Sequence, residues 1–155
     1  MTAIELKYIG KRDDKLFSQA RAHYAKLIAP YAKLTVSPVW NAAIEKAQKI
    51  GAIQAQEAYS QAFFALRSRA AQRSIAVDAL GKTYDTNAFA ELIANGESLC
   101  FYIGGAYGFA REFCKTCDLS VSLSALTFSR DLAQIVLLEQ IYRALTIGAN
   151  HPYGK

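Results

Sequence analysis

The stretch LCFYIGGAYG, residues 99–108, contains five apolar residues followed by a loop with three glycines. An apolar run of this length that ends at glycine is typical of a buried strand. In an open α/β sheet, ligands bind at the carboxyl ends of the strands, and glycines there allow the backbone to lie close to a ligand. The stretch therefore predicts a buried strand that ends either in a plain tight turn or in a ligand-binding loop.

The glycine spacing excludes two common phosphate-binding motifs. Gly104 and Gly105 are adjacent, so the loop does not have the GxGxxG pattern of dinucleotide-binding proteins. The loop also lacks the lysine and the serine or threonine of a P-loop. A dinucleotide or ATP site is therefore not expected here.

Strand-like and helix-like segments alternate on both sides of this stretch. Five strands alternating with helices predict an α/β fold with a mostly parallel sheet covered on both faces. The whole chain, residues 1–155, is expected to form one domain. The expected strands are 3–9, 34–39, 74–80, 99–103 and 121–128. The expected helices are 13–28, a region 42–69 interrupted near Gly51 and firmly helical over about 53–67, then 87–94, 109–116 and a last helix that Ser129 or Asp131 starts and that ends near 147.

Two features near the carboxyl end leave alternatives open. The last helix is apolar around most of its circumference, so it is either central in the monomer or part of a subunit interface. Within it, Glu139 and Arg143 are four residues apart, which suits an ion pair along the helix or a charge kept for a ligand. The alternating serines of 119–127 suit the solvated face of an edge strand or a polar ligand site.

The composition is that of an ordinary globular protein, with 52% hydrophobic and 20% charged residues. No apolar run reaches the roughly 18 residues that span a bilayer, and no signal peptide is recognised, so we expect a cytoplasmic protein with no membrane partner. The net charge of +5 is compatible with a polyanion such as RNA. The tail, 150–155, carries a histidine, a tyrosine and a lysine, which also suit RNA.

The sequence gives little support for metal, redox or nucleophilic chemistry. Cys114 and Cys117 form a CxxC pair, but no second pair has metal-ligand spacing, and the favoured interpretation is two ordinary reduced thiols. The chain has neither a GxSxG elbow nor an HExxH motif. We therefore expect a reaction that uses neither a protein nucleophile nor a metal.

Four motifs occur together in one known family. The glycine loop 104–108, the serine-bearing segment 122–127, the segment EQIYRA at 139–144 and the sequence NHPY at 150–153 have the order and spacing found there. With these motifs the chain resembles the ribosomal RNA large subunit methyltransferase H family, most densely from residue 99 to the end. The resemblance implies a SPOUT-type α/β fold with a trefoil knot, an obligate homodimer and S-adenosylmethionine as cofactor. The implied reaction is methylation of N3 of a pseudouridine in 23S rRNA of the assembled ribosome, and DNA is not an implied partner.

The resemblance also implies roles for individual residues. Gly104 and Gly105 would contact the cofactor through their backbone, and Val77 would be an apolar contact. The wall around the cofactor would consist of Ser124, Ala125, Leu126, Thr127, Phe128 and Ser129. The residues implied to face the RNA or its target base, and so to be catalytic, are Arg143, His151 and Tyr153.

Three positions depart from the family pattern. Arg130 replaces a histidine, Gln134 replaces an arginine, and Gly154 replaces a histidine. We expect these changes to alter RNA recognition more than cofactor binding. Three other interpretations stay open at this point: a methyltransferase of the same class for another RNA, a non-catalytic RNA-binding module, and a CxxC metal or redox protein.

Overall fold

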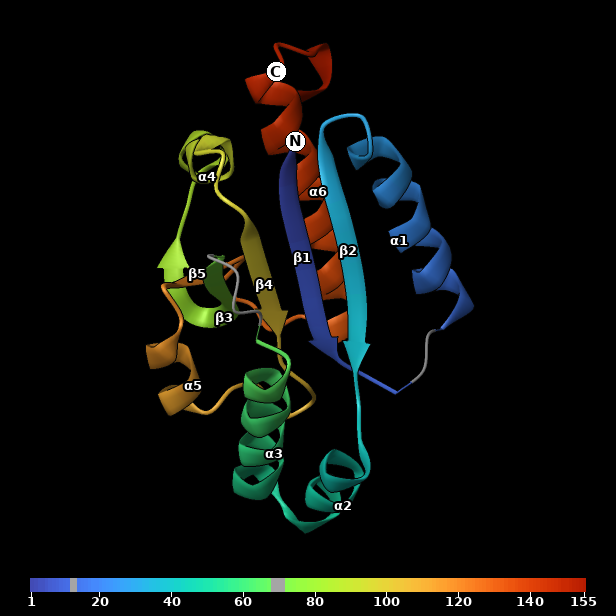
Figure 1. Cartoon of the computed structure of the whole chain (residues 1–155), viewed down its shortest axis with the longest axis vertical. Coiled ribbons are helices and arrows are strands. Elements are labelled where there is room, and N and C mark those ends of the chain that lie inside the picture. The colour runs from blue at the N-terminus through green and yellow to red at the C-terminus, as the bar shows by residue number, and fades with distance from the viewer. Residues whose placement is uncertain (12–13, 68–71) are drawn as a thin grey trace.

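A computed structural model of the protein describes residues 1–11, 14–67 and 72–155. Within these residues the strands form one parallel sheet in the order β2-β1-β4-β3-β5 (Figure 1). The expected parallel sheet is therefore confirmed. The strands are β1 Thr2–Ile9, β2 Ala32–Val39, β3 Arg73–Thr83, β4 Leu99–Ile103 and β5 Leu119–Ser122. All of β4 is buried because it is the central strand, and Pro38 lies in β2 at the sheet edge, where a missing N–H is tolerated.

Four helices begin directly after a residue whose side chain caps the first turn. Asp14, Asn41, Asp85 and Ser129 each accept a hydrogen bond from a backbone N–H of the following turn, at 2.8 to 3.2 Å. The expected helix start at residue 13 lies outside the described residues. The helices are α1 Lys15–Ile28, α2 Ala42–Ile50, α3 Ala52–Ala65, α4 Thr86–Ala94, α5 Arg111–Thr116 and α6 Arg130–Gly148, and a 3-10 turn, η1 Pro152–Gly154, follows them.

Helices cover both faces of the sheet, as expected. On one face α6 packs between α1 and α4, and Leu137, Leu138 and Ile141 of α6 are fully buried there. Residues of α3 and α5 pack against the other face, and Figure 1 shows both helices near the carboxyl ends of the strands. Aromatic rings fill this second core, with Phe63 of α3 against Tyr102 of β4 at 5.0 Å between ring centroids. Of the two positions left open for the apolar last helix, the structure shows the central one within the monomer.

The expected strand over 121–128 is wrong. β5 starts at Leu119 and ends at Ser122, and residues 123–129 form a loop. The serine hydroxyls explain the early end, because Ser122 Oγ donates to the Ser124 carbonyl at 3.0 Å and Ser124 Oγ accepts from Leu126 N–H at 3.1 Å. Such local hydrogen bonds compete with the ladder of a sheet.

Two other regions differ in extent. The expected broken helix over 42–69 is two helices, α2 and α3, separated by the extended Gly51, and residues 68–69 lie outside the described part of the chain. β3 continues to Thr83, because the ladder to β5 shifts register between Val77 and Lys82. Both of those residues pair with Val121. The trefoil knot that the resemblance implies stays a prediction.

The CxxC cysteines belong to the core around α5. Cys117 is half-buried, and burial raises the pKa of its thiol to about 11. Burial also raises the pKa of the Cys114 thiol. In the described ranges no three His, Cys, Asp or Glu side chains form a group that could hold a metal ion. In the same ranges no helix has both the length and the apolarity to cross a bilayer.

Replacing Phe63 with alanine is expected to lower the free energy of unfolding by about 3–5 kcal/mol, because the ring is fully buried and its loss leaves a cavity. Urea denaturation of the purified protein measures this change. Phe64→Ala, at a neighbouring ring that is 43% exposed, is the matched control and is expected to cost clearly less. Equal losses in the two variants would contradict this packing.

Alkylation of Cys117 by iodoacetamide at pH 8 is expected to be slow, because only about 0.1% of a thiol with a pKa near 11 is thiolate at that pH. The rate should rise tenfold per pH unit up to about pH 10. Peptide mass spectrometry after timed labelling measures it, and the chain unfolded in guanidinium is the control, with labelling about 100-fold faster. Rapid labelling of the folded protein at pH 8 would contradict the raised pKa of Cys117.

Candidate functional site

A cavity of about 740 Å³ lies at the carboxyl ends of β3, β4 and β5. Its walls come from three segments far apart in the sequence: 77–80 at and after the pairing of β3 with β4, 103–109 after β4, and 123–130 between β5 and α6. Gln56, Arg111 and Ala133 complete the lining. This size is within the usual range of small-molecule sites, and the carboxyl edge of a parallel sheet is where such sites form.

Most of the residues expected to hold a cofactor line this cavity. Val77, Gly104, Gly105, Ser124 and 126–129 are on its wall. Ala125 is not, although its neighbours on both sides are. The structure therefore brings together segments that only the family resemblance had joined.

The glycine loop is both a tight turn and a wall of the cavity. Gly108 N–H donates to the Gly105 carbonyl at 2.9 Å, and Gly108 has a φ of +70°, which favours glycine. A Cβ on Gly104 would stand 3.0 Å from the backbone of Gly108, and one on Gly105 would stand 2.6 Å from the buried ring of Tyr59. Gln56 of α3 donates to the Tyr107 carbonyl at 2.8 Å. The tight turn is therefore confirmed, and ligand binding by the loop stays a prediction.

The loop 123–129 adds hydroxyl groups and an apolar rim. The Ser124 hydroxyl holds the backbone turn, and the Ser129 hydroxyl caps α6. Leu126 is 72% exposed, Leu80 is 78% exposed and Tyr107 is 42% exposed, although all three line the cavity. Exposed large apolar side chains at a cavity mouth are suited to contact with a ring or with another protein surface.

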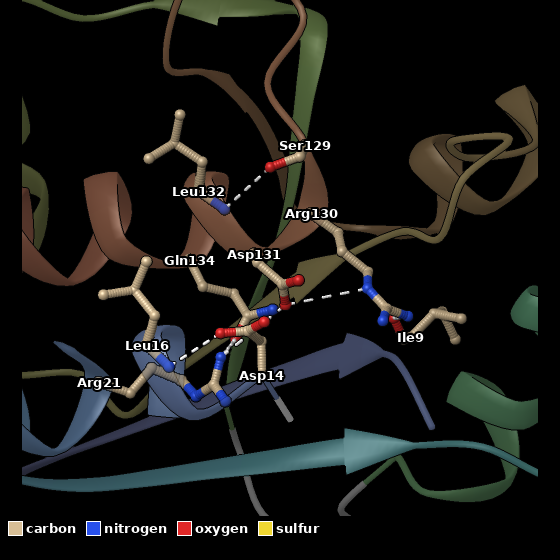
Figure 2. Close-up of polar contacts among 9 residues, drawn as sticks. All are labelled: Ile9, Asp14, Leu16, Arg21, Ser129, Arg130, Asp131, Leu132 and Gln134. Atoms are coloured by element: carbon tan, nitrogen blue, oxygen red, sulfur yellow. Dashed lines mark hydrogen bonds and ion pairs between the residues drawn. The ribbon is translucent and has the colours of Figure 1, made fainter. Parts of the chain in front are cut away.

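Three charged side chains line the cavity, and sequence reasoning had not placed any of them there. Arg111 Nη1 donates to Asp78 Oδ2 at 2.6 Å, and this hydrogen bond raises the pKa of Arg111. Arg130 Nη1 donates to the Ile9 carbonyl at 3.0 Å. Figure 2 shows this guanidinium reaching from the start of α6 to the end of β1. Asp78 could have been suspected, since it directly follows Val77.

The residues expected to be catalytic form a second cluster, at the carboxyl end of α6. Glu139 Oε1 accepts from Arg143 Nη2 at 2.6 Å and from the Tyr153 hydroxyl at 2.8 Å. The Arg143 guanidinium lies 5.0 Å from the centre of the Tyr153 ring. His151 is exposed, and its Nδ1 accepts from Tyr153 N–H at 3.2 Å. The predicted ion pair along the helix is confirmed, and the tail is folded rather than frayed.

Gly154 has a packing role in this cluster. A Cβ at this position would meet the Ile147 side chain and stand 3.0 Å from Ile147 N, so a larger residue here would require Ile147 or the turn to shift. Tyr153 then packs against Tyr142 with the rings tilted by 46° and 4.6 Å between their centroids. The hydrogen bond to Glu139 raises the pKa of Tyr153 and that of Arg143, so the guanidinium stays charged.

The two clusters lie at opposite ends of α6. Arg130, at its first residue, lines the cavity, while the tail follows Gly148 at the other end (Figure 1). A helix of 19 residues is about 28 Å long. Within one chain, the tail therefore lies far from the glycine loop and from the loop 123–129.

Comparison with known proteins adds curated relatives of similar length. The chain is 47% identical over 139 residues to ribosomal RNA large subunit methyltransferase H of Aliarcobacter butzleri, covering 90% of both proteins. It is 41% identical over 157 residues to the protein of the same name in Nitratiruptor sp., covering 100% of both.

Two solved structures share the fold. The SpoU methyltransferase AviRb from Streptomyces viridochromogenes has a TM-score of 0.52 at 15% identity, with 95% of this chain and 61% of that chain covered. A putative RNA methyltransferase from Bacillus anthracis has a TM-score of 0.52 at 10% identity, with 97% and 96% covered. The family model described as predicted SPOUT methyltransferase matches residues 2–154. The chain therefore belongs to the SPOUT methyltransferase family.

Proposed function

We propose that the whole chain is one methyltransferase domain that uses S-adenosylmethionine to methylate N3 of a pseudouridine in 23S rRNA of the assembled ribosome, in the cytoplasm. The observation that carries the proposal is the cavity, whose walls are the glycine loop and the loop 123–129. The names of the curated relatives support an rRNA substrate. The net charge of +5 favours a polyanionic partner.

The cavity fits such a cofactor. A Cβ on Gly104 would collide with Gly108 and one on Gly105 with Tyr59, so glycine at both positions allows the tight turn that forms this wall of the cavity. Val77, Leu126 and Phe128 offer apolar contacts to an adenine ring, and the hydroxyls of residues 124, 127 and 129 lie beside them.

The proposed reaction needs few chemical groups from the protein. When bound, the cofactor supplies a methyl group already activated on a sulfonium, so the residues of the cavity mainly align it. The target N3 carries a proton that must leave. His151, the one histidine of the tail, is the proposed acceptor, and the Arg143 guanidinium would stabilise the negative charge that develops on the base. Tyr153 would hold Arg143 and stack on the RNA.

A homodimer would join the two clusters. Along α6, the side chains at 132, 136, 139, 143 and 147 recur at spacings of three and four and are only partly buried, so they form a stripe left open by α1 and α4. If two copies pack these stripes antiparallel about a two-fold axis, the tail of one copy comes to the cavity of the other. Each of the two sites would then be composed of both subunits.

Wild-type protein is expected to transfer labelled methyl groups from S-adenosylmethionine to ribosomes that lack the modification. His151→Ala and Arg143→Ala are each expected to lower turnover by about 100-fold or more, because they remove the proton acceptor and the charge stabilisation. Affinity for the cofactor, measured by calorimetry, should stay within about twofold. Lys115→Ala, at an exposed residue of α5, is the control.

Transfer only to RNAs other than ribosomal RNA would contradict the substrate assignment. An equal loss of cofactor affinity in His151→Ala and Arg143→Ala would contradict the division of roles between the cavity and the tail.

Mixing two inactive variants is expected to restore activity. Gly105→Ala removes cofactor binding, since its Cβ would collide with Tyr59, and His151→Ala removes the tail function. Random exchange of subunits makes half of the dimers mixed. In each mixed dimer one of the two sites combines an intact cavity with an intact tail. About a quarter of wild-type activity should therefore return. Native mass spectrometry counts mixed dimers. If mixed dimers form but show no activity, the cavity and the tail of each site belong to the same subunit.

A further inference from the structure

Arg130 is held in the cavity wall from two sides. Its Nη1 donates to the Ile9 carbonyl at 3.0 Å, and its Nε lies 3.9 Å from Asp131 Oδ1 (Figure 2). Gly10 makes room for it, because a Cβ there would stand 3.0 Å from Nη1. The guanidinium therefore has a fixed place before any ligand arrives, which lowers the entropy cost of binding to it.

A second arginine supports this arrangement from behind. The same Asp131 Oδ1 lies 3.9 Å from Arg21 Nη1 of α1, and that Nη1 donates to Gln134 Oε1 at 3.1 Å. The Arg21 side chain is only 7% exposed, whereas that of Arg130 is 32% exposed. The Asp131 carboxylate lies 3.9 Å from Arg130 Nε, beyond hydrogen-bond distance, so it offsets only part of the positive charge of Arg130 at the cavity.

The charges of the other residues in the cavity wall also favour Arg130 as the residue that binds an anionic group. The other two charged residues of the wall, Asp78 and Arg111, are joined by a hydrogen-bonded ion pair at 2.6 Å, so their charges largely cancel. A guanidinium has five N–H donors, and the Ile9 carbonyl takes one. Toward the residues that the structure describes, Nη2 makes no hydrogen bond. The cavity therefore favours an anionic oxygen next to Arg130.

We propose that Arg130 binds an oxyanion of the ligand in this cavity. The proposal rests on the proposed function, which offers two sources of that chemistry: the carboxylate of the cofactor's amino-acid part and a phosphate of the RNA strand. A guanidinium forms a pair of parallel hydrogen bonds with either group. Arg130 is then a specificity-determining residue, and Asp131 and Arg21 position it.

The test compares two ligands that differ only in the carboxylate. Calorimetry measures the affinity of wild type and of Arg130→Gln for S-adenosylmethionine and for its decarboxylated form, which keeps the sulfonium and the amine. If the carboxylate is the oxyanion, Arg130→Gln weakens S-adenosylmethionine binding by about 10-fold or more and leaves the decarboxylated ligand within about twofold. Arg130→Lys, which keeps the charge but not the paired donors, should lie between the two.

The second arm measures binding of ribosomes that lack the modification at several salt concentrations. If a phosphate is the oxyanion, Arg130→Gln leaves both cofactor affinities unchanged, weakens RNA binding, and makes the slope of log K against log salt shallower by about 1. Lys115→Gln, a charge change on the exposed side of α5, is the control and should change neither cofactor affinity.

Unchanged affinities in both arms would overturn the proposal, and so would an equal loss for the two cofactor forms, which would indicate a collapsed cavity. Failure of the proposed function gives a different result, because wild type itself would then show no measurable affinity for S-adenosylmethionine.

Discussion

The close approach of the glycine loop to α3 fixes the position of the cavity. β4 is buried along its whole length, so its carboxyl end has one possible place, and the backbone that follows turns back on itself at Gly105 and Gly108. The ring of Tyr59 fills the space that a Cβ on Gly105 would need. Since that ring is buried, it cannot move aside, and the peptide surface of the loop remains open to a ligand.

The second constraint is the length of α6, which sets the distance between the cavity and the tail. It begins at the cavity with Arg130 and carries Arg143 and the tail at its far end, so a rigid helix separates the cavity from the second cluster. A single chain cannot bend such a helix to bring its ends together. The partly exposed stripe on its outer side offers the alternative that we propose, in which a second copy supplies the missing half of each site.

Two departures from the family pattern fall into one contact network. Arg130 and Gln134 are one helical turn apart, and both are linked to Arg21 of α1, directly or through Asp131 (Figure 2). The sequence alone suggested that these changes alter RNA recognition. Their position on and behind the cavity wall makes cofactor recognition an equally direct consequence, because the guanidinium of Arg130 belongs to the cavity itself.

The sequence by itself determined the parallel sheet, the buried strand 99–103 and the glycine loop, and it limited the start of the last helix to Ser129 or Asp131, because periodicity, caps and glycine spacing are local properties. It did not determine where the strand after Leu119 ends, since the hydroxyls of Ser122 and Ser124 outweigh its apolar alternation. Only the tertiary structure decided that Arg130 lies in the cavity and that the tail lies at the opposite end of α6. Both depend on which segments, distant in sequence, meet at one edge of the sheet, and on the fixed length of a helix between them.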